Sequence, residues 1–260
     1  MFKTNVKKMN SIARLTRLLF LSLSLAFCSS TAFPANEIIA FLGDSNTWLG
    51  GEACDNGAGW TKWFRDCYPT SACRSFARSG ATWTETDGTR PDTKEYSELI
   101  TDNNVISNQL LRLEENVGKG SFPTPQIVVV FAGTNDAWFS NKRPSAKMPG
   151  DSRKTAAGIV DATCRRIHKS FPDAKILLIT PPLSTKIPKA EITAISDIIE
   201  KAAAPHKGYT NVLRLDKEGF IDLAKEAKRP AMLKDGVHTS IAGARKTGCI
   251  VADFLTAWLK

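Results

Sequence analysis

The residues best suited to chemistry are a serine and a histidine that stand far apart in the chain. Ser45 follows an apolar run in "FLGDSN", and His238 stands in "LKDGVHTS" with Asp235 three residues before it. A serine hydroxyl attacks an ester when a base removes its proton and a carboxylate orients that base. Asp235 and His238 can lie on one side of a tight turn, with one ring nitrogen toward the carboxylate and the other toward Ser45.

Neither of the other two histidines offers an equivalent arrangement. His168 lies in the basic segment "RKTAAGIVDATCRRIHK", and His206 follows Pro205 where a predicted helix ends. We expect both rings at the surface. Taken alone, the Asp-x-x-His spacing is a weak signal, because an ordinary turn often produces it.

Short apolar runs alternate with segments of helical periodicity along the chain. We expect strands at residues 37–43, 73–80, 126–133, 174–180 and 210–215. We expect helices at residues 58–67, 96–117, 153–170, 188–204 and 241–259. Strands that alternate with helices form βαβ units, which build a parallel sheet covered on both faces. The predicted fold class is therefore α/β.

Three of the predicted strands end in polar turns that contain glycine, at residues 43–46, 79–80 and 133–136. In an open parallel sheet, ligands bind beyond the carboxyl ends of the strands. We therefore expect these turns to gather on one rim of the sheet. The connection 81–94 would run along the same rim.

Four blocks of the sequence resemble, in the same order, the four blocks of the SGNH or GDSL hydrolase superfamily: Gly43-Asp44-Ser45, Gly80, Gly133-x-Asn135-Asp136 and Asp235-x-x-His238. The resemblance spans nearly all of the chain after residue 35. It implies a flavodoxin-like α/β/α sandwich of three layers with a five-stranded parallel sheet. It also implies a serine ester hydrolase that needs neither a cofactor nor a metal ion.

The resemblance implies a role for each matching position. Ser45 would be the nucleophile, His238 the general base and then acid, and Asp235 the group that orients the ring. The amides of Ser45 and Gly80 and the side chain of Asn135 would form an oxyanion hole for the developing negative charge.

Two positions depart from the family pattern. Asn46 replaces the leucine of the family's name, and "FARS" before Gly80 lacks an asparagine often found in that block. The α/β-hydrolase fold, which many other serine hydrolases have, is disfavoured because the residues around Ser45 lack the Gly-x-Ser-x-Gly pattern.

Other residues near these blocks have a structural as well as a functional interpretation. Asp44 and Asp136 are expected to hold turns by accepting backbone hydrogen bonds. Trp83 and Trp138 each follow an oxyanion block by three residues, so they are the candidate substrate-binding side chains, although packing is the default role of a tryptophan. Trp48 has no comparable support.

The first 35 residues differ from the rest and are expected to be a signal peptide. Five basic residues lead into an apolar run at 18–27, and small residues follow. The run is too short to span a bilayer about 30 Å thick. The prediction is export to the periplasm or the extracellular space, with residues 36–260 as the hydrolase domain. A lipid anchor at Cys28 is the second choice, because Phe27 stands where a small residue is expected.

The charge of the chain falls once this segment is set apart. The formal charge is +9, but five basic and no acidic residues lie in 1–35, which leaves 30 basic and 26 acidic residues and a formal +4. A mildly basic protein does not require a nucleic acid partner, and the basic segment lacks the aromatic residues that bind single strands. The expected partner is a small-molecule or oligosaccharide ester.

Five cysteines follow residue 35, so at least one must stay free or pair outside the chain. Export would permit disulfides. Cys67 and Cys73 bracket a short turn, and Cys164 and Cys249 lie on two predicted helices, which makes these the preferred pairs. No Cys-x-x-Cys or paired-histidine spacing indicates a zinc site.

Three functions fit these observations. The favoured one is an exported serine esterase that removes short acyl groups, acetyl first, from carbohydrate. The second keeps the enzyme class but acts on a lysophospholipid or an acyl thioester, although long chains need an apolar trough and the predicted rim is polar. The third is a glycan-binding protein of this fold without turnover, which would have no need for Ser45, Asn135, Asp235 and His238 together.

Overall fold

Five parallel strands form one sheet within the residues that the computed structural model describes, which are 37–139, 154–217 and 219–260. The strands are β1 (Glu37–Gly43), β2 (Thr70–Ser75), β3 (Ile127–Phe131), β4 (Lys175–Ile179) and β5 (Thr210–Leu213). Their order is β2-β1-β3-β4-β5, with parallel pairing at every contact. This flavodoxin-like order confirms the predicted fold class.

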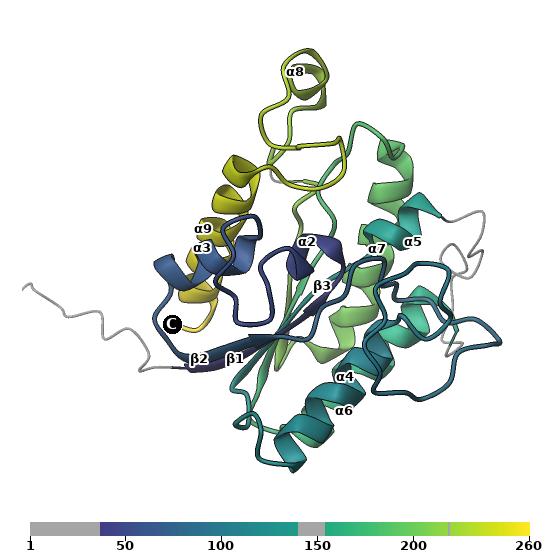
Figure 1. Cartoon of the computed structure of the whole chain (residues 1–260), viewed down its shortest axis with the longest axis vertical. Helices are drawn as coiled ribbons and strands as arrows, with labels where there is room; N and C mark the ends of the chain where they lie inside the picture. Colours follow the sequence, from purple (N-terminus) through teal and green to yellow (C-terminus); the bar gives the residue numbers. More distant parts are fainter. Residues whose placement is uncertain (1–36, 140–153, 218) are drawn as a thin grey trace, which may run out of the picture. The chain divides into compact units, whose positions relative to one another are not determined.

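Helices cover both faces of the sheet and give the predicted three layers (Figure 1). On one face, α3 (Trp60–Cys67) packs against α9 (Ile241–Trp258). On the other lie α4 (Ile106–Gly118), α6 (Ala156–Ser170) and α7 (Lys189–Ala203). The described residues also form four shorter helical segments, which are too short for helical periodicity to reveal: α2 (Ser45–Trp48), α5 (Thr134–Trp138), the 3₁₀ turn Ala204–His206 and α8 (Leu223–Lys228).

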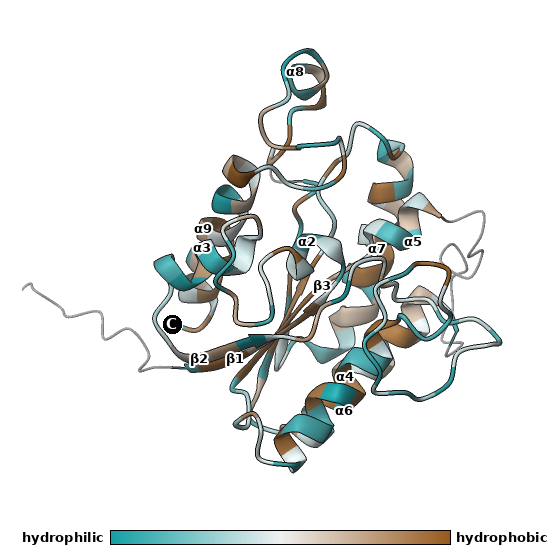
Figure 2. Cartoon of the chain, viewed as in Figure 1, coloured by the Kyte–Doolittle hydropathy of each residue, from teal (hydrophilic) through white to brown (hydrophobic). Residues whose placement is uncertain are grey.

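The alternation of side chains along β3 divides the core into two parts. All five residues of this strand are buried. Val128 and Val130 join the apolar cluster beneath α4, α6 and α7, whereas Ile127, Val129 and Phe131 join the cluster beneath α3 and α9. Successive side chains of a strand point to opposite faces, so a strand covered on both sides is a continuous apolar run. Figure 2 shows these hydrophobic strands between the more polar outer faces of the helices.

The two largest boundary errors lie in the connection between β2 and α4, and β2 also begins at Thr70 rather than at residue 73. β2 ends at Ser75 rather than at residue 80, and α4 begins at Ile106 rather than at residue 96. The Asn104 side-chain amide donates to the carbonyl oxygens of Ser79 and Glu98, at 2.7 and 3.2 Å. These side-chain contacts satisfy the backbone of a long loop where helical turns were expected.

None of the helices in the described parts of the chain has the length and apolar composition needed to cross a membrane. The predicted signal peptide and the alternative anchor at Cys28 lie outside the described residues. Export therefore stays a prediction.

Both preferred cysteine pairs are wrong. The Sγ atom of Cys67, at the end of α3, lies 3.0 Å from the Sγ atom of Cys249 on α9. Cys73 on β2 packs against the apolar cluster that contains Cys54. Cys164 is buried on α6, which covers the opposite face of the sheet from α9, so it cannot approach Cys249. All five thiols of the described residues are free.

The expectation that His206 lies at the surface is also wrong. Its ring is buried, with Nε2 2.8 Å from an Asp161 carboxylate oxygen and Nδ1 2.8 Å from the Tyr209 hydroxyl. Both ring nitrogens are thus occupied by structural contacts. His168 is exposed as expected, and its ring stacks on Tyr209 with the ring centroids 4.0 Å apart.

Candidate active site

Ser45, His238 and Asp235 form one hydrogen-bonded line at the carboxyl edge of the sheet. The Ser45 Oγ atom lies 2.9 Å from His238 Nε2, and His238 Nδ1 lies 2.7 Å from Asp235 Oδ2. A carboxylate only accepts hydrogen bonds, so Nδ1 carries the ring hydrogen and the Nε2 lone pair accepts the Ser45 hydroxyl. The structure thus joins residues 193 positions apart in a geometry that lets the ring withdraw the serine proton.

The turn after β1 fixes the position of Ser45. Asp44 caps α2 by accepting the amide of Asn46 at 3.0 Å, and Ser45 is the first residue of that helix. The Asp44 amide donates to the carbonyl oxygen of Phe131, at the end of β3, over 3.1 Å. Asp44 therefore holds the turn, which is the structural role expected of a short acidic side chain there.

Gln109, on α4, reinforces the same turn, although no sequence pattern singles it out. Its Oε1 atom accepts the amide of Gly43 at 2.8 Å, and its Nε2 atom donates to the carbonyl oxygen of Gly43 at 2.9 Å. The side chain is buried, so these bonds satisfy both of its polar atoms. A Cβ atom on Gly43 would lie 2.4 Å from the Phe131 carbonyl oxygen, so only glycine lets the backbone pass so close to β3.

Asn46 links the serine turn to the histidine loop, a role that the sequence did not predict. Its side chain is fully buried, and its Oδ1 atom accepts the amide of Thr239, next to His238, at 3.1 Å. A leucine at this position has no acceptor for that amide. The departure from the family pattern therefore supplies a contact that holds the histidine loop against α2.

Asp235 closes the turn that carries His238. Its Oδ1 atom accepts the amides of Val237 and His238 at 3.0 and 2.8 Å, while Oδ2 faces the ring. Partial burial raises the pKa of Asp235, but the hydrogen bonds from His238 and Val237 outweigh it, so the pKa lies below its ordinary value. The carboxylate is therefore ionised at neutral pH and able to orient the ring.

The turns after β2 and β3 are bonded to each other through Asn135 and Asp136. Asn135 Nδ2 donates one hydrogen to the carbonyl oxygen of Ala81 at 2.9 Å, and this amide has a second hydrogen. The Asp136 carboxylate accepts the amides of Trp83 and Thr84 at 3.0 and 2.9 Å. Asp136 thus braces its turn as expected, and also ties it to the segment that follows Gly80.

Gly80 adopts a backbone conformation that disfavours any side chain. Its φ is +80°, and a Cβ atom would lie 2.8 Å from the amide nitrogen of Leu99. The same turn is attached to β1, because the amide of Arg78 donates to the carbonyl oxygen of Gly43 at 3.1 Å. Hydrogen bonds therefore connect all three predicted strand-end turns.

The two tryptophans chosen as substrate contacts differ in the structure. Trp83 is fully buried in the apolar cluster that contains Ile106 and Leu110, so it presents no ring face to a substrate and its role is packing. Trp138 is 40% exposed and stacks on Phe139. Trp48, which lacked support in the sequence, is 43% exposed on the same short helix as Ser45.

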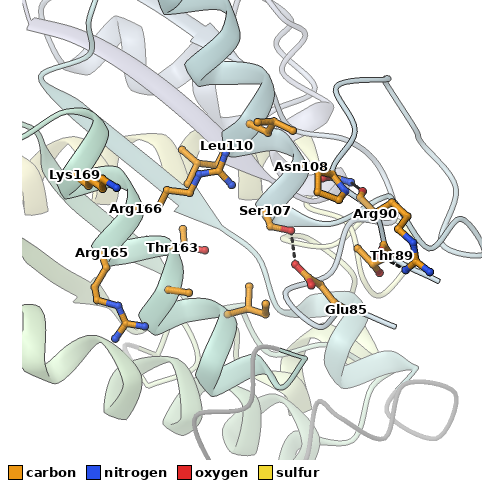
Figure 3. A pocket seen from close by; sticks show the side chains of 14 residues that line it. Glu85, Thr89, Arg90, Ser107, Asn108, Leu110, Thr163, Arg165, Arg166 and Lys169 are labelled. Atoms are coloured by element: carbon orange, nitrogen blue, oxygen red, sulfur yellow. Dashed lines mark hydrogen bonds between the residues drawn. The ribbon is translucent and has the colours of Figure 1, made fainter. Parts of the chain in front are cut away.

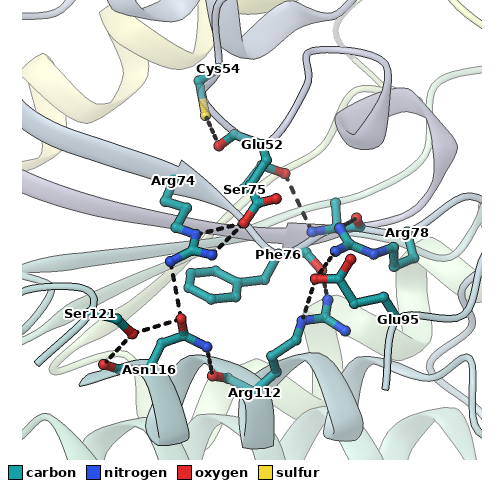
Figure 4. A network of polar contacts seen from close by, with 11 residues as sticks. Glu52, Cys54, Arg74, Ser75, Phe76, Arg78, Glu95, Arg112, Asn116 and Ser121 are labelled. Carbon is teal, nitrogen blue, oxygen red and sulfur yellow. Dashed lines mark hydrogen bonds and ion pairs between the residues drawn. The ribbon is translucent and has the colours of Figure 1, made fainter. Parts of the chain in front are cut away.

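A cavity of about 210 Å³ opens beside α2. Its lining includes Trp48, Glu52, Arg78 and Glu95, but not Ser45, His238 or Asp235. Trp48, on the same short helix as Ser45, connects the cavity to the site. Figure 4 shows that Glu95 reaches both Arg78 and Arg112, so the loop after Gly80 is anchored by a shared ion pair at the cavity wall. The walls of this cavity are mainly polar and charged.

A larger cavity, of about 720 Å³, lies between α4 and α6 (Figure 3). Residues such as Glu85, Ser107 and Arg166 line it, and Ser45, His238 and Asp235 do not. Its arginines have partners in the protein: the guanidinium of Arg166, for example, donates to the Glu114 carboxylate. Unlike the smaller cavity, the larger one has no lining residue on α2, so it lies apart from the serine and histidine chemistry.

Burial of Asp44 predicts a pH dependence of stability. Burial raises the pKa of Asp44 to about 6, although contacts with Thr134 and Asn46 and the charge of His238 lower it. Because this lies above the ordinary 3.8, the folded protein binds more protons than the unfolded chain between the two values. The Asp44 carboxyl should therefore reduce the free energy of unfolding by about 3 kcal/mol as pH rises from about 4 to about 7.

The Asp44→Asn variant should lack this contribution while keeping the cap, since asparagine caps helices as well as aspartate. Urea unfolding of both proteins at the two pH values measures the difference. The same pH dependence in both proteins would contradict the prediction.

The fold and the site define a class: α/β ester hydrolases with a serine at the end of the first strand. The chain belongs to the GDSL-like lipase/acylhydrolase family, whose model matches residues 41–246. The predicted family is thereby confirmed, and the protein is an ester hydrolase.

Solved structures share this fold. The acetyl xylan esterase AlAXEase is 22% identical, with a TM-score of 0.53 over 85% of this chain and 98% of that chain. The lipase/acylhydrolase from Enterococcus faecalis is 18% identical, with a TM-score of 0.53 over 85% and 96%. A protein from Lactobacillus plantarum is 15% identical, with a TM-score of 0.61 over 86% and 98%. No curated protein matches the sequence.

Proposed function

We propose that the protein is an exported serine esterase that removes short acyl groups, acetyl first, from carbohydrate. The line from Asp235 through His238 to Ser45 carries the proposal. Ser45 Oγ attacks the ester carbonyl carbon while His238 Nε2 takes its proton, and the ring then protonates the departing alcohol oxygen. A water molecule, deprotonated by the same nitrogen, hydrolyses the acyl-serine and regenerates the enzyme.

The oxyanion formed in each step would be stabilised by the amides of Ser45 and Gly80 and by the second amide hydrogen of Asn135. Two contacts support this role. The bond from Asn135 Nδ2 to the Ala81 carbonyl oxygen fixes the orientation of the side-chain amide. Gly80, in the left-handed backbone conformation, has no Cβ atom to keep a substrate away from its backbone amide. Donors that are already oriented stabilise a developing charge without reorganisation.

Asn135→Ala should lower kcat by ~10²–10³, because it removes one oxyanion donor. KM should change little, since the donor acts mainly on the transition state. Initial rates on p-nitrophenyl acetate measure both constants. Asn211→Ala, on the distant edge strand β5, is the matched control. A kcat close to that of the wild type in Asn135→Ala would remove this residue from the oxyanion hole.

The polar cavity beside α2 favours a carbohydrate over a lipid as the alcohol part of the substrate. Its lining combines the exposed ring of Trp48 with the charged groups of Glu52, Arg78 and Glu95. An aromatic ring next to hydrogen-bonding groups suits a sugar, which has both an apolar face and hydroxyls. One solved structure of this fold is an acetyl xylan esterase, which is consistent with a carbohydrate substrate.

A series of p-nitrophenyl esters from acetyl to dodecanoyl tests the acyl part of the proposal. We expect kcat/KM to be highest for acetyl and to fall as the chain lengthens. Acetate release from acetylated xylan and other O-acetylated glycans tests the alcohol part. A maximum at long acyl chains would replace the proposal with a lysophospholipase or thioesterase activity of the same site.

Export rests on the basic and apolar leader at residues 1–35. To test export, the protein is expressed in a bacterium, recovered from outside the cytoplasm, and its mass is measured. Cleavage close to residue 35 is the expected result, whereas an intact chain that stays in the cytoplasm would contradict export. A lipid attached to Cys28 would instead support the anchor.

A further inference from the structure

Cys67 and Cys249 face each other across the contact between α3 and α9. Their sulfur atoms lie 3.0 Å apart, although the residues are 182 positions apart in sequence. The two helices approach closely at this point, because a Cβ atom on Gly248 would lie 2.5 Å from the amide nitrogen of Phe64. A disulfide brings two sulfurs to about 2.05 Å, so this helix contact already presents both thiols to each other.

Cys54 and Cys73 form a second matched pair, on the loop that follows α2 and on β2. The amide of Ser75 donates to the carbonyl oxygen of Glu52 at 2.9 Å, which holds this loop along the strand. Cys54 is fully buried, and Cys73 packs against the same apolar cluster. The interaction of the two thiols raises the pKa of Cys54, as burial also does. The same interaction lowers the pKa of Cys73 and outweighs the effect of its burial, which raises it.

Cys164 has neither of these neighbours. It lies on the other face of the sheet, in the cluster beneath α6, and is fully buried. Burial raises the pKa of this thiol to about 12. A buried and protonated thiol is a poor nucleophile for exchange with a disulfide.

We propose that the oxidised protein carries two disulfides, Cys67–Cys249 and Cys54–Cys73, and keeps Cys164 as a free thiol. Each bond forms by exchange with a disulfide oxidant such as glutathione disulfide. One cysteine thiolate attacks a sulfur of the oxidant and releases the first thiol, and the paired cysteine then attacks the mixed disulfide and releases the second. The two protein thiols lose their protons and two electrons, and the oxidant leaves as two thiols.

These bonds would join the segments that carry the candidate active site. α3 lies downstream of Ser45 and α9 begins just after His238, so Cys67–Cys249 ties together the helices that follow both residues. Cys54–Cys73 ties the loop after α2 to the strand that leads to Gly80. A cross-link restricts the unfolded chain more strongly when it closes a longer loop, so the first bond should contribute more to stability. The pairing does not depend on the proposed reaction.

Peptide mapping of the full chain tests the pairing. The purified protein is incubated with glutathione disulfide, unfolded, treated with a maleimide and digested without reduction. Mass spectrometry should find two linked peptide pairs, Cys67 with Cys249 and Cys54 with Cys73, and a maleimide on Cys164. A map that lacks either pair, or that links Cys67 to Cys73, overturns the proposal.

Thermal unfolding of the oxidised protein provides a second readout. Cys67→Ser and Cys249→Ser should each lower Tm by roughly 10 °C, and the double variant by no more than either single one, because all three lose the same bond. Cys164→Ser is the matched control and should retain both linked pairs. A Tm of Cys67→Ser equal to that of the wild type would overturn the first bond. If a variant does not fold, the map of the wild type decides.

Discussion

Ser45→Ala is expected to lower kcat on p-nitrophenyl acetate by roughly 10⁶-fold. The Ser45 Oγ atom lies 2.9 Å from His238 Nε2, so alanine removes both the nucleophile and the proton that the ring is placed to accept. His238→Ala should cost about as much. The double variant should be no slower than either single one, because residues that act as a unit lose their effect together. Some acceleration should remain from the oxyanion donors.

A fluorophosphonate probe separates loss of the nucleophile from loss of the fold. Wild-type protein should be labelled on Ser45, and Ser45→Ala should show no label while its far-UV circular dichroism is unchanged. Ser121→Ala, an exposed serine in the loop before β3, is the matched control for activity and labelling. Labelling of Ser45→Ala at the rate of the wild type would place the nucleophile elsewhere in the chain.

The strands of this fold were predictable because burial on both faces gives a parallel strand a local signature. The run at 127–132 is apolar throughout, and all five residues of β3 are buried. The start of α4 was not predictable, because Asn104 makes contacts with Ser79 and Glu98 that satisfy the loop backbone. Local periodicity contains no information about such partners.

The sequence predicted that Ser45, His238 and Asp235 come together, as they do in the structure, but it did not predict the residues that position them. Four sequence blocks pointed to Ser45 and His238 as candidate catalytic residues, because a reaction allows only a few residue types at each catalytic position. Asn46 and Gln109 act through hydrogen bonds to Thr239 and Gly43, which lie 193 and 66 positions away. Only the fold brings these partners together, so no spacing in the sequence could have revealed them.

Burial explains the two errors among the side chains expected at the surface or at the rim. Trp83 follows Gly80 closely, but the backbone amide of Trp83 is bound by Asp136 and its ring turns into the core. His206, expected at the surface, is likewise buried. The pairing of Cys67 was misjudged for another reason, because its neighbour Cys249 is distant in sequence and close only through the packing of α3 on α9. Closeness in sequence was therefore a poor guide both to the role of Trp83 and to the partner of Cys67.

Asp235→Asn should lower kcat by ~10³–10⁴ while leaving the turn intact. In the wild type, Oδ1 of Asp235 accepts two backbone amides and Oδ2 accepts the Nδ1 hydrogen of His238. The asparagine oxygen would keep the two amides, which places its NH₂ group against Nδ1. Nδ1 must then act as an acceptor, so the ring hydrogen moves to Nε2 and the lone pair that receives the Ser45 proton is lost.

Rates on p-nitrophenyl acetate at neutral pH measure this effect, and Asp222→Asn is the matched control because Asp222 caps α8 away from the histidine turn. Unfolding in urea should give nearly equal midpoints for Asp235→Asn and the wild type, since the bonds that close the turn persist. The Asp235 side chain is 47% exposed, so water can compete for Nδ1 and keep the loss below that of Ser45→Ala. If kcat of Asp235→Asn stayed within tenfold of the wild type, the ring would be oriented by other contacts and Asp235 would serve the turn alone.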